Sequence, residues 1–379
     1  MPSETRLSLS LEPVTPIHVS SNRESVVGID AILEGGYVIF IDLESSIKNL
    51  EPGALERILS MISSREGLYR VVESIRREGK LVPLFKAVAK TRLSSGASIR
   101  LMQRTIIPGS TLKGYIRTAI LYEILRSIKE PKNILDEKIR RNLSGDPRYV
   151  SQDLENYLLR AQRLPKQGGY VDAFTNLIVS DPIIERYELA VREMRVIERA
   201  TGNAIARIFV VTLESGLLRY DIQISKPIDI EKIIVESNMR DKIQDILKRL
   251  SLVAEIVRND PLNLIRVLRE YGCRLLREEL QRLKKTSSSP VYSVYVKKLE
   301  ELEKLCSSRD CAPARIGFGA GHEAKTIALY LRDVYPDLYD ELKKQMSNRV
   351  GRIWDSLTLK AVYEDGSLIG VGWCKICIS

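Results

Sequence analysis

The order of strand-like and helix-like segments is the feature of this sequence that most restricts its fold. The chain opens with three β-rich runs, RLSLSL, VVGIDAIL and YVIFIDL, and Glu34-Gly35-Gly36-Tyr37 joins the last two as a short hairpin turn. A helix with apolar residues at helical spacing then begins at Pro52. Strands and helices follow one another irregularly from there, whereas a doubly wound sheet needs regular alternation. We therefore expect an α+β fold with antiparallel sheets.

The rest of the chain repeats this order with helical insertions. We expect mixed, mainly helical structure up to about residue 90, and strands at 98–107, 175–180, 207–214 and 217–224, with Gly216 as the turn between the last two. We expect helices from Leu112 to about Ile128, over 131–165, over 229–285 with a break at Asp260-Pro261, and over 292–305. The sequence ends in a predicted hairpin with the turn Glu364-Asp365-Gly366.

This order predicts two domains. A chain of 379 residues suits two or three domains, and a hydrophobic content of 44% excludes a largely disordered protein. We place the domains at residues 1–170 and 171–379, the second with a long helical insertion at about 229–310. No apolar run approaches the ~18–20 residues needed to span a bilayer, and the first residues show no targeting pattern, so we expect a cytoplasmic protein.

The five cysteines favour buried thiols over disulfides. Their number is odd and small for the length, which argues against a disulfide framework. Cys374 and Cys377 could form half of a zinc site, with Cys306 and Cys311 as partners. However, residues three apart on a strand point to opposite faces of the sheet, so Cys374 and Cys377 could not easily share one metal. We therefore expect no metal and no cofactor.

The charge of the chain points to a polyanion as partner. The net charge is +10 and the pI is about 9.2, which suits nucleic acid or an anionic membrane surface. Residues 90–126 concentrate this excess, because seven basic residues stand there against Glu123 alone. Residues 240–285 are also basic but contain many acidic residues, so we interpret them as a solvated face with ion pairs. The 90–126 segment lacks acidic partners of its own, which favours binding of a polyanion.

The centre of this basic segment has the form of a phosphate site. Pro108 and Gly109 end a strand, and Ser110 or Thr111 can cap the helix that follows. Lys113 and Arg117 lie four residues apart on that helix, beside its buried stripe and near its start. The positive end of a helix and two cations would then meet at one place, which suits a phosphate.

At this point the sequence resembles a known family. The run IPGSTLKGYIRTAIL looks like the hallmark of the RAMP superfamily of CRISPR proteins, where this loop and helix contact guide RNA. Four further landmarks resemble the family in the right order: Thr15-Pro16-Ile17-His18-Val19, Val179-Ser180-Asp181, the glycine-rich loop from Arg315 to His322 with Lys325-Thr326, and the closing Gly372-Trp373 hairpin. Together they resemble the subunit-five family of the type III-A Csm interference complexes.

This resemblance implies two ferredoxin-like RAMP domains that bind the 3′ part of a crRNA at one end of a multisubunit filament. It implies a non-catalytic protein without cofactor, because other subunits of such complexes do the cleaving. Its partners would be crRNA and the other Csm subunits, above all the backbone RAMP subunit, with host nucleases as candidates for 3′ trimming and no membrane. The predicted RNA-binding residues are His18, Arg104, Ser110, Thr111, Lys113, Arg117, Arg315, Gly317, Gly319, Gly321, His322 and Lys325.

The glycine-rich loop has two further interpretations. Gly319 with Lys325-Thr326 lies one residue from a nucleotide-binding Walker A pattern, but Ala324 replaces the second glycine and no buried strand precedes the loop. We therefore favour glycines that let backbone N–H groups approach an RNA phosphate. A tight structural turn remains the alternative.

Two other functions stay open from the sequence. His18 and His322 are the only histidines, and a metal-independent endoribonuclease needs a general acid and a general base of this kind. Nothing in the sequence brings the two histidines together. The other alternative is a protein–protein adaptor that uses the long helices expected at 229–305.

Overall fold

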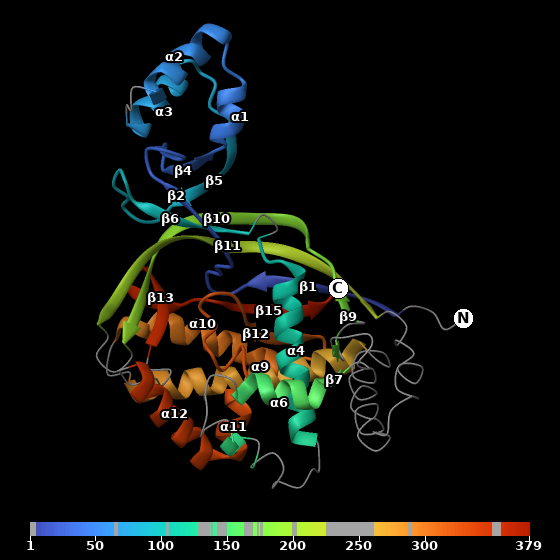
Figure 1. Ribbon diagram of the computed structural model, residues 1–379. Helices are drawn as coiled ribbons and strands as arrows, with labels where there is room; N and C mark the ends of the chain where they lie inside the picture. The colour runs from blue at the N-terminus through green and yellow to red at the C-terminus, as the bar shows by residue number, and fades with distance from the viewer. Residues whose placement is uncertain are drawn as a thin grey trace.

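A computed structural model describes residues 5–63, 67–103, 106–127, 137, 139–141, 150–162, 170–172, 174, 177–198, 203–224, 261–286, 290–350 and 358–379. These residues form an α+β fold, as expected. One large mixed sheet has a layer of helices on one face, and a small helical lobe projects from the other end of the molecule (Figure 1). Among the described residues, no helix is long and apolar enough to cross a membrane.

The first strand lies inside the sheet. β1 (Thr5–Pro13) pairs antiparallel with β11 (Ala204–Ile224) on one side and with β15 (Trp373–Ile378) on the other. The alternation of RLSLSL explains this position, because its leucines are buried while the serines between them are half-buried. β12 (Cys311–Arg315) continues the sheet beyond β15. Strands from both predicted domains thus share one sheet, and the division at 170/171 stays a prediction.

A long hairpin of β10 (Ile183–Glu198) and β11 crosses the sheet, and here one prediction is wrong and one strand was missed. Gly216 is not a turn: β11 runs through it without a break, with Gly216 opposite Tyr187 of β10. β10 was not predicted because its many charged residues obscure the period-two pattern of a strand. The short β9 (Leu177–Val179) pairs with the far end of β11.

The other end of the sheet contains the predicted hairpin. β3 (Ala31–Glu34) and β4 (Tyr37–Ile41) are joined by Gly35 and Gly36, which both have positive φ as such a turn requires. β4 pairs with β5 (Pro83–Ala89), so the expectation of mainly helical structure up to about residue 90 is wrong for this segment. β2 (Ser20–Val26) pairs with β6 (Ser98–Met102), which in turn lies beside β11.

The projecting lobe consists of α1 (Leu43–Lys48), α2 (Pro52–Ser63) and α3 (Leu68–Arg77) (Figure 1). It has a small core of its own, in which Ile58 of α2 and Ile75 of α3 are almost completely buried. The helix predicted to begin at Pro52 is thereby confirmed.

α4 (Gly109–Ser127) lies in the middle of the helical layer (Figure 1). Its predicted apolar stripe is buried as expected. α4 packs beside α9 (Pro261–Thr286), where the rings of Tyr115 and Tyr271 are 5.7 Å apart. The other named helices among the described residues are α6 (Val150–Leu159), α10 (Ser293–Glu303), α11 (Ala328–Val334) and α12 (Pro336–Val350). Most of the helices predicted at 131–165 and at 229–260 lie outside the described residues.

Shorter elements complete the fold. The C-terminal hairpin is β13 (Thr358–Glu364) and β14 (Ser367–Gly370), with the predicted turn between them, and β15 follows after Gly372. A two-stranded sheet of β7 (Arg160–Gln162) and β8 (Tyr170–Asp172) stands apart from the main sheet. Two 3₁₀ turns, η2 (Pro290–Tyr292) and η3 (Lys304–Ser307), flank α10.

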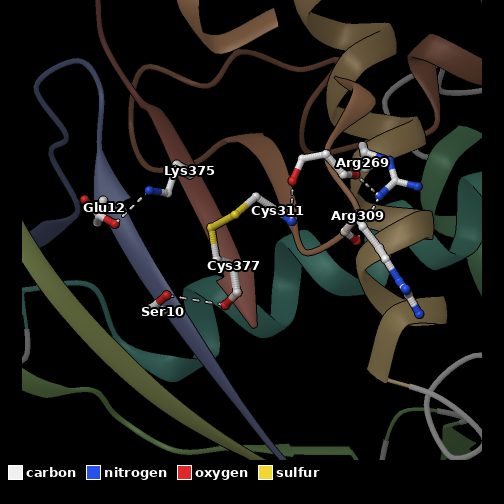
Figure 2. Close-up of a disulfide and its surroundings, with 8 residues drawn as sticks. Ser10, Glu12, Arg269, Arg309, Cys311, Lys375 and Cys377 are labelled. Carbon is white, nitrogen blue, oxygen red and sulfur yellow. Dashed lines mark hydrogen bonds and ion pairs between the residues drawn. A yellow bond between two sulfur atoms is a disulfide. The ribbon is translucent and has the colours of Figure 1, made fainter. Parts of the chain in front are cut away.

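The expectation of reduced thiols is wrong. Cys311 and Cys377 form a disulfide between β12 and β15, next to the Glu12–Lys375 ion pair (Figure 2), and a second disulfide joins Cys273 of α9 to Cys306 of η3. Only Cys374 is a free, buried thiol. The count of cysteines does not show which of them lie close together in the fold. Cys311 and Cys377 are far apart in sequence but are direct partners in the strand register. Three of the four cysteines considered for zinc are therefore disulfide-bonded.

These disulfides are expected to contribute to stability. They close loops of 66 and 33 residues, so losing either one should lower the free energy of unfolding by about 2–4 kcal/mol. Denaturant unfolding with and without reductant measures this loss, and the Cys311→Ala/Cys377→Ala double variant isolates one bond. Thiol titration of the denatured, unreduced protein should find one free thiol, that of Cys374. Five free thiols would contradict the pairing.

Candidate functional site

The landmark segments of the sequence meet around one pocket, which we call the loop–helix pocket. It has a volume of about 390 Å³ and lies between the start of α4 and the glycine-rich loop after β12. Its lining residues are Val19, Ser20, Ser110, Thr111, Gly114, Tyr115, Thr118, Arg315, Ile316, Gly317, Phe318, Ala320, Ala324 and Lys325. The fold thus brings together five of the predicted site residues, namely Ser110, Thr111, Arg315, Gly317 and Lys325.

The start of α4 is fixed from another part of the chain. The backbone N–H of Gly109 donates to the Asp181 carboxylate at 2.9 Å, so Asp181 caps the helix in place of the predicted Ser110 or Thr111. A Cβ atom on residue 109 would lie 2.1 Å from the Ser180 carbonyl oxygen, so only glycine permits this approach. The Val179-Ser180-Asp181 landmark therefore has a structural role: it leaves the Ser110 and Thr111 side chains facing the pocket.

The glycine-rich loop is attached to the segment that follows β1. The N–H of Phe318 donates to the His18 carbonyl oxygen at 2.8 Å. Gly317 has φ +80°, and a Cβ atom there would lie 2.6 Å from the same carbonyl oxygen. Gly321 also has φ +80°, but open space surrounds it. Gly317 therefore lies in a tight structural turn that also forms part of the pocket wall.

Three cations approach one another at this loop. Lys325 lines the pocket, and burial lowers the pKa of its amine. Lys360 of β13 donates to the Phe318 carbonyl oxygen at 3.3 Å and stands 4.3 Å from the centre of the Phe318 ring. Burial, and after it the charges of Lys325 and Arg315, lower the pKa of Lys360. Among the described residues that line the pocket none is acidic, so a bound anion would relieve this repulsion.

Arg315 forms the back of the pocket. Its side chain is about nine-tenths buried, pairs with Glu279 of α9 at 3.2 Å, and stacks over the Trp373 ring at 5.3 Å. Its Nε atom is buried and makes no hydrogen bond within the described structure. Burial would lower the pKa of the guanidinium, but Glu279 raises it, so Arg315 stays charged. One donor of a buried cation is thus left unused next to the pocket.

Lys360 is a site residue that sequence analysis missed. It lies in β13 between buried Leu359 and Ala361, within the run SLTLKAVY. A single lysine in an otherwise apolar strand is the signal that could have identified it. Its distance in sequence from the glycine-rich loop concealed the connection.

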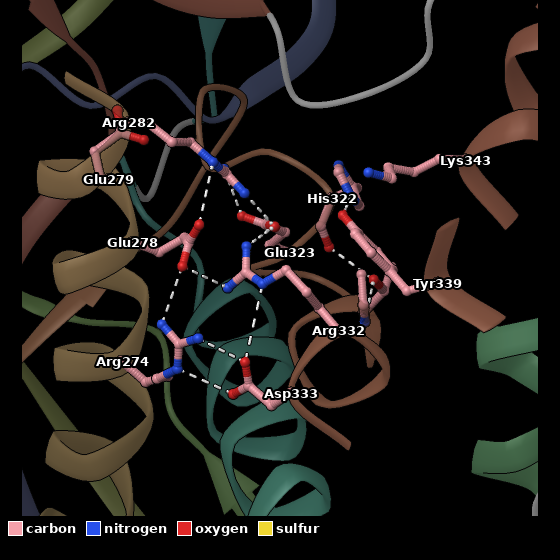
Figure 3. A network of polar contacts seen from close by, with 12 residues as sticks. Arg274, Glu278, Glu279, Arg282, His322, Glu323, Arg332, Asp333, Tyr339 and Lys343 are labelled. Carbon is pink, nitrogen blue, oxygen red and sulfur yellow. Dashed lines mark hydrogen bonds and ion pairs between the residues drawn. The ribbon is translucent and has the colours of Figure 1, made fainter. Parts of the chain in front are cut away.

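The second half of the loop is held by an ion-pair network (Figure 3). Glu323 accepts two hydrogen bonds from Arg282 of α9, at 2.6 and 2.8 Å, and one from Arg332 of α11 at 2.7 Å. Burial would raise the pKa of Glu323, but the hydrogen bonds and charge of Arg282, together with the charges of Arg332 and His322, lower that pKa overall. The cations of this network have acidic partners, whereas no ion pair of Lys325 or Lys360 is found among the described residues, so we interpret the network as positioning the loop.

Lys113 and Arg117 do not line the pocket. Arg117 forms ion pairs with Glu155 and, at 2.7 Å, with Asp172, and it lies 5.0 Å from the centre of the Phe174 ring. Burial lowers the pKa of Lys113. Residues 90–126 have few acidic partners of their own, but distant segments supply them: Lys90 pairs with Glu214, Arg100 with Glu24, and Arg126 with Glu270. Much of the charge expected to bind a polyanion is therefore paired within the protein. Arg104 lies outside the described residues.

The two histidines have different environments and do not line the pocket either. The His18 side chain is almost completely buried, its Nδ1 atom lies 2.7 Å from the Val211 carbonyl oxygen, and its ring meets Phe318 edge-on. Burial lowers its pKa, so the ring is neutral near pH 7. His322 is the last residue of the glycine-rich loop, and its Nε2 atom lies 3.5 Å from the Tyr339 hydroxyl. The structure does not bring His18 and His322 together at one surface.

No protein-family model matches the sequence, and no curated protein matches it significantly. The fold, however, matches solved structures over nearly its whole length. A chain of a cryo-EM structure of a Csm–crRNA–target RNA ternary complex, from a type III-A CRISPR–Cas system, aligns with a TM-score of 0.65 and 18% identity, covering 98% of this chain and 100% of the other. The chain therefore has the fold of a type III-A Csm subunit.

The second match is more specific. The crystal structure of T. onnurineus Csm5 aligns with a TM-score of 0.59 and 18% identity, covering 97% of this chain and 100% of that one. In its fold the protein is Csm5-like, and the resemblance seen in the sequence motifs is confirmed at this level.

The attachment of the glycine-rich loop can be tested with two matched variants. Gly321→Ala places a side chain at φ +80° in open space and should cost about 1–2 kcal/mol of unfolding free energy. Gly317→Ala has the same φ but also meets the His18 carbonyl, so it should cost about 1–3 kcal/mol more. Urea unfolding of both variants measures the difference. Equal losses would show that the contact with His18 does not hold the loop.

Proposed function

We propose that this protein is the non-catalytic crRNA-binding subunit of a type III-A Csm ribonucleoprotein, built from two ferredoxin-like RAMP domains and covering the 3′ part of the crRNA. The loop–helix pocket carries this proposal. It combines the positive end of α4 with the lining cations Arg315 and Lys325, beside which Lys360 contacts Phe318, and no acidic residue is among the described lining residues. The fold shared with a chain of a Csm–crRNA–target RNA complex supports it.

The pocket would bind the RNA backbone. Ser110 and Thr111 offer hydroxyl groups at the start of α4, and Lys325 offers charge from the opposite wall. Contacts of this kind fix a nucleic acid in place without selecting its sequence. A crRNA-binding subunit must accept guides of any sequence, so backbone binding suits the proposed role.

Membership of a complex would supply the remaining partners. We propose that the protein adjoins the backbone RAMP subunit of the Csm complex and supports crRNA maturation. In this proposal, host nucleases trim the RNA end that the protein covers. The helices α9 and α12 lie away from the β10–β11 hairpin and would offer a separate surface to neighbouring subunits (Figure 1).

The endoribonuclease alternative has less support. A general acid or base must reach the scissile phosphate. The His18 ring, however, is hydrogen-bonded to the Val211 carbonyl oxygen and almost completely buried. His322 contacts Tyr339 instead of the loop–helix pocket. We therefore assign no catalytic residue.

RNA binding through the pocket can be tested by charge reversal. Lys325→Glu should weaken the binding of a 3′-labelled guide-like RNA at every sequence tested, and Lys360→Glu should do the same. Removing one phosphate contact should reduce the slope of log affinity against log salt by about 1. Lys297→Glu, an equal charge change on an exposed position of α10, is the matched control. Three variants with the same affinity and slope would rule out this pocket as the RNA site.

The absence of catalysis can be tested on the same RNA. Denaturing gels should show intact RNA in EDTA and in Mg²⁺, while native gels show a shift. Cleavage in EDTA that is lost in His18→Ala or His322→Ala would establish the endoribonuclease alternative. Neither a shift nor cleavage would favour an adaptor that meets RNA only inside the assembled complex.

A further inference from the structure

A second hollow, which we call the β10 groove, lies on the other side of the start of α4. It has a volume of about 820 Å³, within the range of sites that hold small ligands. Its lining residues are Ser21, Arg23, Leu84, Phe85, Leu101, Met102, Gln103, Ile106, Pro108, Ser110, Asp181, Ile184, Tyr187 and Leu189. Ser110 lines both this groove and the loop–helix pocket, so the two hollows meet at the first turn of α4.

The chemistry of the groove differs from that of the pocket. Ile106, Met102 and Leu189 are buried and form an apolar floor. The charged side chains among the described lining residues are Arg23 and Asp181, so the groove carries one positive and one negative charge. Such a surface does not favour a phosphate. It suits an uncharged, flat group with polar edges.

Two aromatic side chains could stack on such a group. Phe85 lines the groove and is held in place by Phe40, whose ring lies parallel to it with centroids 4.4 Å apart. Tyr187 is 53% exposed, and Leu84, the residue before Phe85, is 52% exposed. Exposed apolar side chains that line one hollow mark a binding site more strongly than scattered ones do.

The backbone around the groove is strained. Ile106 has φ +60°, which is unfavourable for a β-branched residue, and Asn22 between the lining residues Ser21 and Arg23 also has φ +60°. Two register irregularities in β10 lie on either side of Tyr187. Strain and bulges of this kind concentrate at functional sites, because they direct side chains where a regular strand would not.

We propose that the β10 groove receives a nucleobase of the RNA whose backbone is held in the loop–helix pocket. Phe85 and Tyr187 provide the stacking surface, and Ser110 stands where the phosphate and the base of one nucleotide separate. The inference rests on the proposed function. Continuity with the pocket at Ser110 favours a base over a side chain of a neighbouring protein, because a nucleotide joins a charged group to a flat uncharged one.

Photocrosslinking tests where the base lies. Guide-like RNAs with 5-iodouridine at one position at a time are bound to the full-length protein and irradiated, and the crosslinked peptides are mapped. One or two positions should crosslink to the peptides that contain Phe85 or Tyr187. An RNA that shifts on a native gel but crosslinks only elsewhere would overturn the inference and leave the proposed function intact.

An abasic nucleotide at the crosslinked position then measures the contribution of the base. It should weaken wild-type binding by about tenfold, as loss of one stacked base does. Tyr187→Ala should weaken binding of the unmodified RNA similarly, and the abasic change should add little in that variant. Tyr363→Ala, which removes an exposed tyrosine on β13, is the control and should leave binding unchanged.

The remaining outcomes overturn the inference in distinguishable ways. If the abasic RNA binds the wild type as tightly as the unmodified RNA, the groove holds no base. If Tyr187→Ala keeps its RNA affinity but no longer joins the purified complex, the groove binds a protein neighbour. If the wild type shifts no RNA at all, the proposed function fails and the inference with it.

Discussion

The position of β1 between β11 and β15 is the constraint on which the rest of this structure depends. The segment that follows β1 continues the contacts: Gly372 donates to the Pro16 carbonyl oxygen, Ile17 and Leu213 exchange backbone hydrogen bonds, and the His18 carbonyl accepts from Phe318. The glycine-rich loop is therefore attached to the segment after the first strand, although 300 residues separate His18 from Phe318 in the chain. Without β1 in place, the pocket would lose the wall opposite α4.

Buried positive charges fall into two groups in this fold, and the group without acidic partners among the described residues lies at the loop–helix pocket. Arg117, Arg192 and Arg282 each have acidic partners at hydrogen-bond distance, brought from other segments by the fold. Such pairs offset the cost of removing a cation from water. Lys325 and Lys360 lie together instead, and burial lowers the pKa of both amines. The net charge of the chain therefore says less about binding than the few cations whose repulsion the protein leaves uncompensated.

The sequence is informative where local chemistry decides the structure, and it is silent where distant segments meet. The α4 helix, the Gly35-Gly36 hairpin and the landmark motifs were predictable because periodicity and turn residues act within a few positions. The disulfides, the acidic partners of Arg117, the cap from Asp181 and the role of Lys360 each join residues far apart in the chain. For the same reason, the landmarks identified segments of the pocket without showing that Lys113 and Arg117 lie outside it.

The sheet order also has a consequence for biosynthesis. β1 is made before its neighbour β15, and more than three hundred and fifty residues separate the two strands. Until then one edge of β1 is unpaired, and Gly372 and Trp373 are not there to hold the segment from Val14 to Pro16. A chain still being translated past Lys325 thus contains every lining residue of the loop–helix pocket without the framework that shapes it. The pocket would then take its final shape only after β15 has left the ribosome, which separates the synthesis of its lining residues from the formation of the pocket.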